Sequence, residues 1–242
     1  MAATEGGPRV SVNGNLNNAK RAKNDEFYTR LEDIEKELEH YRGKFFGQTV
    51  YLNCDDYRVS AFWTYFKTNF QSLGLKRLIA TNHVRNVTPE GGGFLAEVVE
   101  MVDGLLEQRV SRLKGDGDFR RTESESLLKQ SDTVVSNPPF SLFREYVAQL
   151  VEHGKKFLII GSMNAITYKE IWPIIQRGDL WLGASAVKMF KLPEGAPHSD
   201  KHVVDERGQR FQSFGNIRWF TNLDYGKRLE DVPLRETYSP EN

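Results

Sequence analysis

Cysteine is almost absent from this sequence of 242 residues, which contains a single one, Cys54. One cysteine cannot form an internal disulfide, and it excludes a zinc site built from several thiolates. An excess of charge is also absent, because 33 basic residues balance 33 acidic residues. Net charge therefore identifies no partner, although a chain of balanced charge can still carry a basic face that binds nucleic acid.

Long apolar runs are missing as well. No run approaches the roughly 18 residues of a membrane-spanning helix, and no signal peptide precedes the first predicted element. The five histidines show none of the spacings of metal ligands. Together with the lone cysteine, these absences predict a cytoplasmic protein with neither a membrane segment nor a bound metal.

The chain divides into a tail and one folded domain. Residues 1–23 are rich in Gly, Asn, Ala and Lys and contain almost no large apolar side chains, which predicts a flexible tail. Residues 24–242 show no internal repeat and no clear second domain. The length is within the range of a single α/β domain.

Strand-like and helix-like segments alternate at least four times after the tail. This alternation predicts an α/β fold with a mostly parallel central sheet and helices on both of its faces. Within residues 83–117, Asp103-Gly104 between two partly alternating runs favours a β-hairpin, and a pair of helices is the competing interpretation. The predicted strands are residues 49–53, 76–81, 132–137 and 155–161, with later strands at 179–184, 187–193 and 215–224 and a polar loop at 194–213; the predicted helices lie within residues 25–45, 58–74, 122–131, 141–154 and 164–178.

Polar side chains gather at the predicted strand ends. "NCDD" (53–56) follows the first strand and "ATN" (80–82) ends the second. "GDGDF" (115–119) precedes a short helix, and "SNPPF" (136–140) ends the strand after it. Ligands of such sheets bind in the crevice outside the carboxyl ends of the strands, so the sequence predicts one shared cleft.

The Asn-Pro-Pro-Phe segment is the most distinctive of these strand ends. Asn137 offers a side-chain carbonyl, and the carbonyl of Pro138 has no competing N–H group at Pro139. Two rigidly aimed acceptors suit an exocyclic amine, and Phe140 can stack on the planar ring that carries the amine. The segment therefore indicates a grip on the amino group of a heteroaromatic base. The alternative is a simple strand end followed by a core phenylalanine.

With these motifs in place, the chain resembles the EcoRI family of adenine-specific DNA modification methyltransferases. The resemblance implies a Rossmann-like S-adenosylmethionine-dependent methyltransferase fold in one catalytic domain, residues 24–242. It also implies a monomer that transfers a methyl group from S-adenosylmethionine to N6 of an adenine flipped out of double-stranded DNA. The resemblance rests on the stretches "DEFYT", "VYLNCDDYRVSAFWTYF", "NFQSLGLKRLIAT", "GDGDFR", "NPPFSLFREYVAQL", "KKFLIIG", "NAITYKEIWPII", "WLG" and "WFTNLD".

The resemblance also suggests which residues carry the chemistry. Asn137, Pro138, Pro139 and Phe140 would hold the target adenine, with hydrogen bonds that aim the lone pair of N6 at the methyl group.

For the cofactor, we infer from their position at the first strand end that Asn53, Asp55 and Asp56 line its pocket. Many relatives in the wider superfamily have a glycine-rich turn at this point, and this chain has no glycine there. Tyr57 also stands where the family usually has a proline. Capping of the following helix by Asp55 or Asp56 is the alternative interpretation.

Two further segments complete the expected cofactor site. Asp118 would accept a hydrogen bond from the cofactor's adenine amine, and Phe119 would pack on the adenine ring. The neighbouring glycines would let the backbone approach the ligand, although a plain tight turn is the alternative. Phe27, Tyr28 and Thr29 would close over the methionine end of the cofactor, or form a helix entry packed on the core.

The resemblance leaves open how DNA is recognised. Family members commonly continue well beyond "TNLD", so we expect a shortened C-terminal recognition region, replaced by loops such as 193–213 or by another chain. Residues 199–210 are predicted to be a loop whose position allows contact with DNA. The competing functions are an amino-methyltransferase that acts on RNA or on a protein glutamine, and a catalytically silent binding protein.

Overall fold

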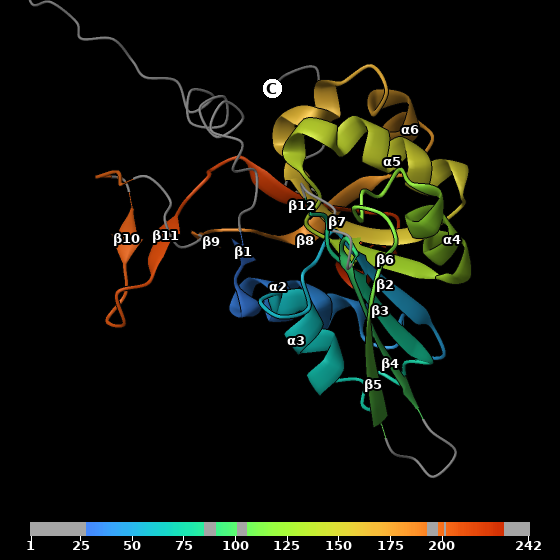
Figure 1. Cartoon of the computed structure of the whole chain (residues 1–242). Coiled ribbons are helices and arrows are strands. Elements are labelled where there is room, and N and C mark those ends of the chain that lie inside the picture. Colours follow the sequence, from blue (N-terminus) through green and yellow to red (C-terminus); the bar gives the residue numbers. More distant parts are fainter. Residues whose placement is uncertain (1–27, 85–90, 101–105, 193–197, 201, 230–242) are drawn as a thin grey trace, which may run out of the picture.

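A computed structural model of the chain shows a large sheet covered by helices (Figure 1). The eight-stranded sheet has the order β5-β4-β3-β2-β6-β7-β12-β8. The predicted tail, residues 1–23, lies outside the part of the chain that the structure describes. The described residues are 28–84, 91–100, 106–192, 198–200 and 202–229. The strands of this sheet are β2 (Thr49–Asn53), β3 (Arg77–Thr81), β4 (Phe94–Glu100), β5 (Leu106–Arg112), β6 (Thr133–Ser136), β7 (Lys156–Ser162), β8 (Trp181–Ala186) and β12 (Ile217–Thr221).

The strand directions in this sheet are mixed. β2 pairs in parallel with β3 and β6, and β6 pairs in parallel with β7. β4 is antiparallel to β3 and β5, and β12 is antiparallel to β7 and β8. The prediction of a mostly parallel sheet is therefore not confirmed. Parallel neighbours need a long crossover, usually a helix, whereas β4 and β5 form a hairpin and β12 arrives from a second, smaller sheet.

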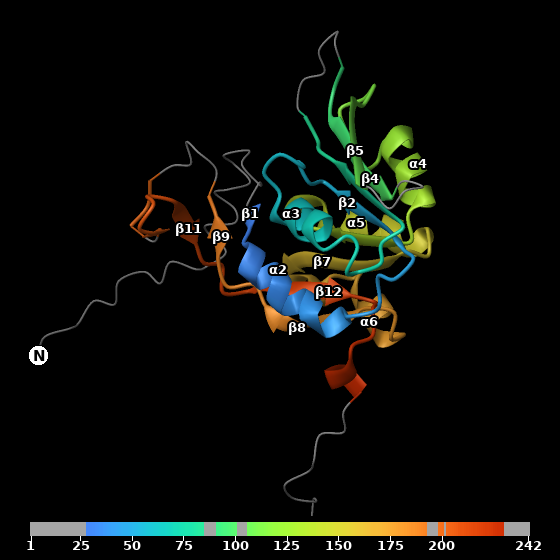
Figure 2. The same ribbon diagram turned by 90° about the horizontal axis from the view of Figure 1, so that it is seen from below.

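The pleat of β2 separates two hydrophobic cores. Val50 and Leu52 belong to the core under α2 and α3, whereas Tyr51 between them belongs to the core under α4, α5 and α6. This alternation is the two-residue period of a strand that is buried on both faces. Helices cover both faces of the sheet, as predicted (Figure 2). The helices are α2 (Leu31–Leu38), α3 (Ala61–Thr68), α4 (Thr122–Gln130), α5 (Phe143–Glu152) and α6 (Trp172–Gln176), with short 3-10 helices η1 (Glu39–Tyr41), η2 (Phe140–Leu142), η3 (Met163–Thr167) and η4 (Gly226–Leu229).

A second sheet stands beside the first, with four short strands in the order β1-β9-β11-β10. They are β1 (Tyr28–Thr29), β9 (Phe190–Lys191), β11 (Arg210–Gln212) and β10 (Val203–Val204). The prediction of a loop for residues 194–213 is therefore wrong in part, because β10 and β11 both fall inside it. Strands of two or three residues are too short to show an alternating pattern in the sequence.

Two ambiguous segments are resolved by the structure. β4 and β5 pair along their length, so the predicted hairpin is confirmed and the helix pair is wrong; its turn at Asp103-Gly104 lies outside the described residues. The predicted helix at residues 164–178 is divided into η3 and α6. Pro173 stands in the first turn of α6, where a missing N–H group does no harm.

Candidate functional site

A pocket of about 330 Å³ lies where β2, β3 and β6 end. Its wall also includes β1, the start of α3 and the loop before α4. The pocket confirms that the polar strand ends share one cleft. The predicted site residues that line it are Tyr28, Thr29, Asp55, Asp56, Asp118, Phe119, Asn137 and Pro139.

Other predicted residues lie away from the pocket wall. Asn53 is fully buried, and Pro138 is also buried. Phe140 is half-buried and packs against the core. None of these three residues lines the pocket. Phe27 lies outside the described residues.

The turn after β2 depends on one residue with an unusual backbone. Cys54 has φ of 80°, and among the described residues it is the only non-glycine with a positive φ. This left-handed conformation costs an L-residue roughly 1–2 kcal/mol, which is why glycine is common in such turns. The turn directs the Asp55 N–H group to the carbonyl of Thr81, 2.9 Å away. The glycine-free turn therefore adopts a conformation that usually calls for glycine.

Asp55 is a buried carboxyl group that faces the pocket. Its side-chain oxygens accept hydrogen bonds from the hydroxyl groups of Ser60 and Ser136, both at 2.8 Å. Burial raises the pKa of Asp55 to about 7, although the two serine hydrogen bonds act in the opposite direction. Near neutral pH the group exchanges easily between neutral and charged forms, and a nearby cation would favour the charged form.

Neither aspartate caps the following helix through its side chain, so the capping alternative is wrong. The N-cap of α3 is Ser60, whose hydroxyl oxygen accepts a hydrogen bond from the N–H group of Trp63 at 3.3 Å. The Asp56 carboxylate instead binds the guanidinium group and the N–H group of Arg58. Burial of Asp56 opposes ionisation, but the hydrogen bonds from Arg58 outweigh it and lower its pKa.

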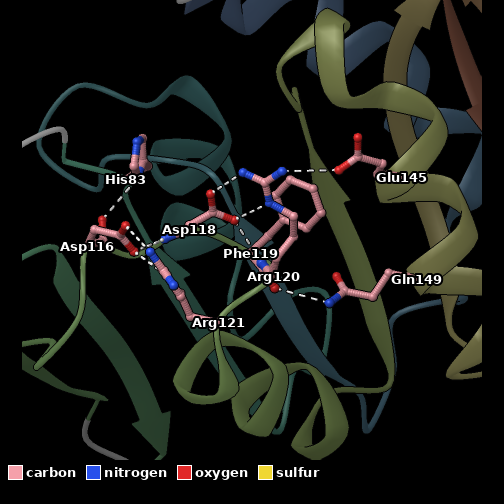
Figure 3. Close-up of polar contacts among 8 residues, drawn as sticks. All are labelled: His83, Asp116, Asp118, Phe119, Arg120, Arg121, Glu145 and Gln149. Atoms are coloured by element: carbon pink, nitrogen blue, oxygen red, sulfur yellow. Dashed lines mark hydrogen bonds and ion pairs between the residues drawn. The ribbon is translucent and has the colours of Figure 1, made fainter.

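Arg120 contacts both residues that are predicted to bind the cofactor's adenine, Asp118 and Phe119 (Figure 3). Its guanidinium group donates to both oxygens of Asp118, at 2.9 and 2.6 Å, and to Glu145 of α5 at 3.1 Å. The hydrogen bonds from Arg120 lower the pKa of Asp118 and keep it charged. The guanidinium carbon also lies 5.5 Å from the centroid of the Phe119 ring. A ligand that uses Asp118 and Phe119 must therefore share them with Arg120 or displace it.

The loop before α4 requires glycine for a different reason from the one expected. Gly117 has φ of 78°, and a Cβ atom there would overlap the backbone carbonyl of Asn82. The glycine thus lets two protein loops cross; it also lines the pocket, and close approach of its backbone to a ligand stays a prediction. The crossing places Asn82 and His83 in the pocket wall, and His83 Nδ1 lies 3.1 Å from the carbonyl oxygen of Asp116 (Figure 3).

The proline elbow follows β6 directly. Ser136, the last residue of β6, donates its hydroxyl hydrogen toward Asp55 and the carbonyl oxygen of Asn53, which ties the elbow to the end of β2. Pro139 has an extended backbone, and its carbonyl oxygen accepts from the N–H group of Leu142 at 2.9 Å. Asn137 lines the pocket, but its Oδ1 atom is buried. Rotation about χ2, a soft torsion, would turn this oxygen.

The ring of Phe140 packs on another aromatic ring. Its centroid lies 6.5 Å from that of Phe190, with an angle of 82° between the two planes. Phe190 is fully buried and pairs in register with Thr29 of the pocket wall. In this structure Phe140 thus follows the alternative of a phenylalanine packed against the core, and its ring contacts Phe190, the partner of Thr29 in the pocket wall.

Several lining residues were not among the predicted site residues. Ser60 and Arg120 gave no signal, because their roles depend on contacts with Asp55 and Asp118 that form only in the folded chain. Asn82 could have been found, since it belongs to a polar strand end. The lining residues missed from sequence are Cys54, Ser60, Ala61, Phe62, Asn82, His83, Gly117, Arg120 and Leu142.

Within the described ranges, no group of three or more His, Cys, Asp or Glu side chains could hold a metal ion. The helices of the same ranges include none that is long and apolar enough to cross a membrane.

Comparison with known proteins identifies relatives over most of the chain. Residues 15–242 match the model of a family described as adenine-specific methyltransferase EcoRI. The type II methyltransferase M.EcoRI of Escherichia coli is 46% identical over 95% of this chain and 74% of its own length. M.MpnI of Mycoplasma pneumoniae is 40% identical over 92% of this chain and 69% of its own, and M.MgeORF184P of Mycoplasma genitalium is 36% identical over 86% and 64%. No solved structure matches the chain.

Proposed function

The chain belongs to the family of adenine-specific EcoRI methyltransferases, and from this membership we infer that it is a site-specific DNA adenine methyltransferase of the restriction–modification type. We propose that S-adenosylmethionine donates the methyl group and that N6 of an adenine in double-stranded DNA accepts it. One observation carries the proposal: Asn137 and Pro139 of the elbow line the same pocket as Asp55 and Asp118. Residues proposed to grip the amine and residues proposed to hold a cationic cofactor thus line one cavity.

The fold supports the same proposal. The run of strands β3-β2-β6-β7 is parallel and is covered by helices on both faces. The pocket lies at the carboxyl ends of these strands, where α/β sheets bind nucleotide-like ligands. We therefore propose a Rossmann-like methyltransferase core that is extended at its edges by antiparallel strands.

The pocket suits S-adenosylmethionine in size and charge. A volume of about 330 Å³ falls in the range of small-molecule sites, roughly 300–1,000 Å³. S-adenosylmethionine supplies a methyl group on a positively charged sulfonium. Asp55 would pair with the cofactor's ammonium group, and Tyr28 and Thr29 would close over its methionine end. The Asp118 carboxylate would accept a hydrogen bond from the adenine amine of the cofactor after the Arg120 side chain moves away.

The elbow would hold the target base by geometry. As the bond from N6 to the methyl group formed, the bond from the methyl group to sulfur would break, and N6 would release its extra proton to solvent. The adenine leaves the duplex to reach the pocket. Asn137 Oδ1, turned about χ2, and the carbonyl oxygen of Pro138 would accept hydrogen bonds from the two N–H groups of N6. These bonds withdraw the nitrogen lone pair from the ring and aim it at the methyl group. Pro139 would support the base, and Phe140, which packs against the core and on Phe190, would hold the elbow in place.

The test is direct. The wild-type protein and Asn137→Ala are expressed in cells that lack other adenine methylation, and their DNA is read by long-read sequencing. We expect N6-methyladenine at one recognition sequence with the wild type and none with the variant. Absence of the mark with the wild type would overturn the proposal, and label from S-adenosylmethionine in RNA or protein glutamine would identify the competing substrate.

A further inference from the structure

The hairpin formed by β10 and β11 stands apart from the eight-stranded sheet in both views (Figures 1 and 2). Its strands are antiparallel, with Val203 opposite Phe211 and Val204 opposite Arg210. None of these four residues belongs to either of the two hydrophobic cores between the large sheet and its helices. The hairpin is therefore a projecting ribbon at the outer edge of the four-stranded sheet, in which β11 is also paired with β9.

The two valines of β10 are unusually exposed. Val203 is 54% exposed and Val204 is 57% exposed. Successive residues of a strand point to opposite faces, so each face of the ribbon presents a branched apolar side chain to solvent. Burial of such side chains against a partner stabilises the complex by roughly 25 cal/mol for each Å² of apolar surface buried.

The tip of the hairpin is a rigid turn that presents an arginine. The Asp205 carboxylate accepts from the N–H groups of Arg207 and Gln209, at 3.0 and 2.8 Å. Gly208 has φ of 75°, which completes the turn. The Asp205 charge is thus directed at the backbone, and the exposed side chain of Arg207 makes no ion pair within the described part of the chain.

The ribbon is continuous with the wall of the pocket. Phe211 and Gln212 of β11 pair with Lys191 and Phe190 of β9. Phe190 in turn pairs with Thr29 of β1, which lines the pocket. An unbroken ladder of strands therefore runs from the pocket to the exposed hairpin. Through its ring contact with Phe140, Phe190 also joins this ladder to the proline elbow.

We propose that the β10–β11 hairpin enters a groove of the DNA duplex beside the target adenine and contributes to sequence recognition. This inference rests on the proposed function. A two-stranded ribbon fits the major groove of B-DNA. There, whichever of Val203 and Val204 faces the bases would contact thymine methyl groups, and Arg207 would donate to a guanine edge or to a phosphate. The strand ladder sets the distance between this contact and the flipped base.

The test compares this hairpin with the β4–β5 hairpin. Arg207→Ala and the double variant Val203→Ser/Val204→Ser are matched with Arg109→Ala and Val110→Ser on β5, where Val110 is 44% exposed. Affinity is measured by fluorescence anisotropy with labelled duplexes that contain or lack the recognition sequence. We expect the first two variants to lose roughly tenfold in affinity for the specific duplex, and the β5 controls to stay within twofold.

Further readouts separate the possible outcomes. Circular dichroism and the dissociation constant for S-adenosylmethionine should be unchanged, which shows that the variants fold. If Arg207 reads a base, Arg207→Ala loses affinity only for the specific duplex; if it binds phosphate, affinity falls on both duplexes and the salt dependence weakens. Unchanged affinity in both β10–β11 variants overturns the hairpin's role. Hairpin-dependent binding without methylation by the wild type overturns the proposed function alone.

Discussion

The two walls of the pocket are built on different principles. The carboxylate wall, formed by Asp55 and Asp118, carries charge, and each carboxyl group already has partners inside the protein. The elbow wall, formed by Asn137 and Pro139, carries no charge and depends on the shape of the backbone. The first wall can change its state with pH or with the position of Arg120. The elbow wall has no charge to change, so its function depends only on the positions of its atoms.

One residue joins the two walls. Ser136 ends the strand that leads into the elbow, and its hydroxyl group lies 2.8 Å from an oxygen of Asp55. A change in the charge of Asp55 therefore alters the hydrogen bond of Ser136, the residue directly before the elbow. We expect the elbow wall to govern the rate of methyl transfer and the carboxylate wall to govern cofactor affinity and pH dependence.

The largest expected effect is on the elbow wall. Asn137→Ala should lower kcat by roughly 100-fold or more, because the transition state loses a positioned hydrogen-bond acceptor. The dissociation constant for S-adenosylmethionine should stay within twofold, since the carboxylate wall is intact. Single-turnover methylation and calorimetry give the two values. Retention of more than about a tenth of the rate would contradict the amine-grip role.

The next prediction concerns the pH dependence of the carboxylate wall. The pKa of Asp55 is about 7 in the folded protein, well above its value in an unfolded chain. Between about pH 4 and pH 7 the folded state keeps a proton that the unfolded state has lost, so stability falls as pH rises, by at most about 1.4 kcal/mol per pH unit. Asp55→Asn stays neutral and should remove this slope, which urea unfolding at several pH values measures. An equal slope in both proteins would contradict the prediction.

The same group should make cofactor binding depend on pH. A cationic ammonium group favours the charged form of Asp55, so S-adenosylmethionine should bind more tightly to the wild type at pH 8 than at pH 6. Asp55→Asn should bind the cofactor more weakly and lose this dependence. Calorimetry at both pH values is the measurement, and a pH dependence that persists in the variant would remove Asp55 from the cofactor site.

A smaller and opposed pair of effects tests Arg120. Asp118→Ala removes an acceptor and should weaken S-adenosylmethionine binding by about tenfold. Arg120→Ala frees Asp118 and the face of Phe119, so it should strengthen binding by a few-fold. Equilibrium dialysis with both variants gives the comparison. Weaker binding in both would show that Arg120 is itself a ligand of the cofactor.

The smallest effect is expected at Cys54, which lines the pocket but contributes neither to the carboxylate pair nor to the elbow. Cys54→Gly should change the free energy of unfolding by no more than about 1 kcal/mol, because relief of the left-handed strain is offset by a more flexible unfolded chain. Cys54→Val should destabilise the protein, since a branched side chain tolerates this conformation poorly. Urea unfolding ranks the three proteins. Equal stability of Cys54→Gly and Cys54→Val would contradict the prediction that the left-handed backbone at Cys54 is strained.

Local features of the chain can be predicted from the sequence where they depend on residues that are close together in the sequence. The bounds of β2 and the β4–β5 hairpin follow from apolar runs and turn residues. The position of the elbow at a strand end and its place in the pocket were also predicted. The second sheet was missed, because its strands contain two or three residues and derive their stability from pairing between distant segments.

The sequence by itself determined that polar strand ends would meet in one cleft and that a diproline corner would stand there. Both properties follow from strand periodicity and from the restricted backbone of proline. Only the tertiary structure decided that Asp55 is shared by two serines, that Arg120 covers Asp118 and Phe119, and that Phe140 rests on Phe190. These contacts join residues from separate elements, and their energies exist only after folding has removed the intervening water.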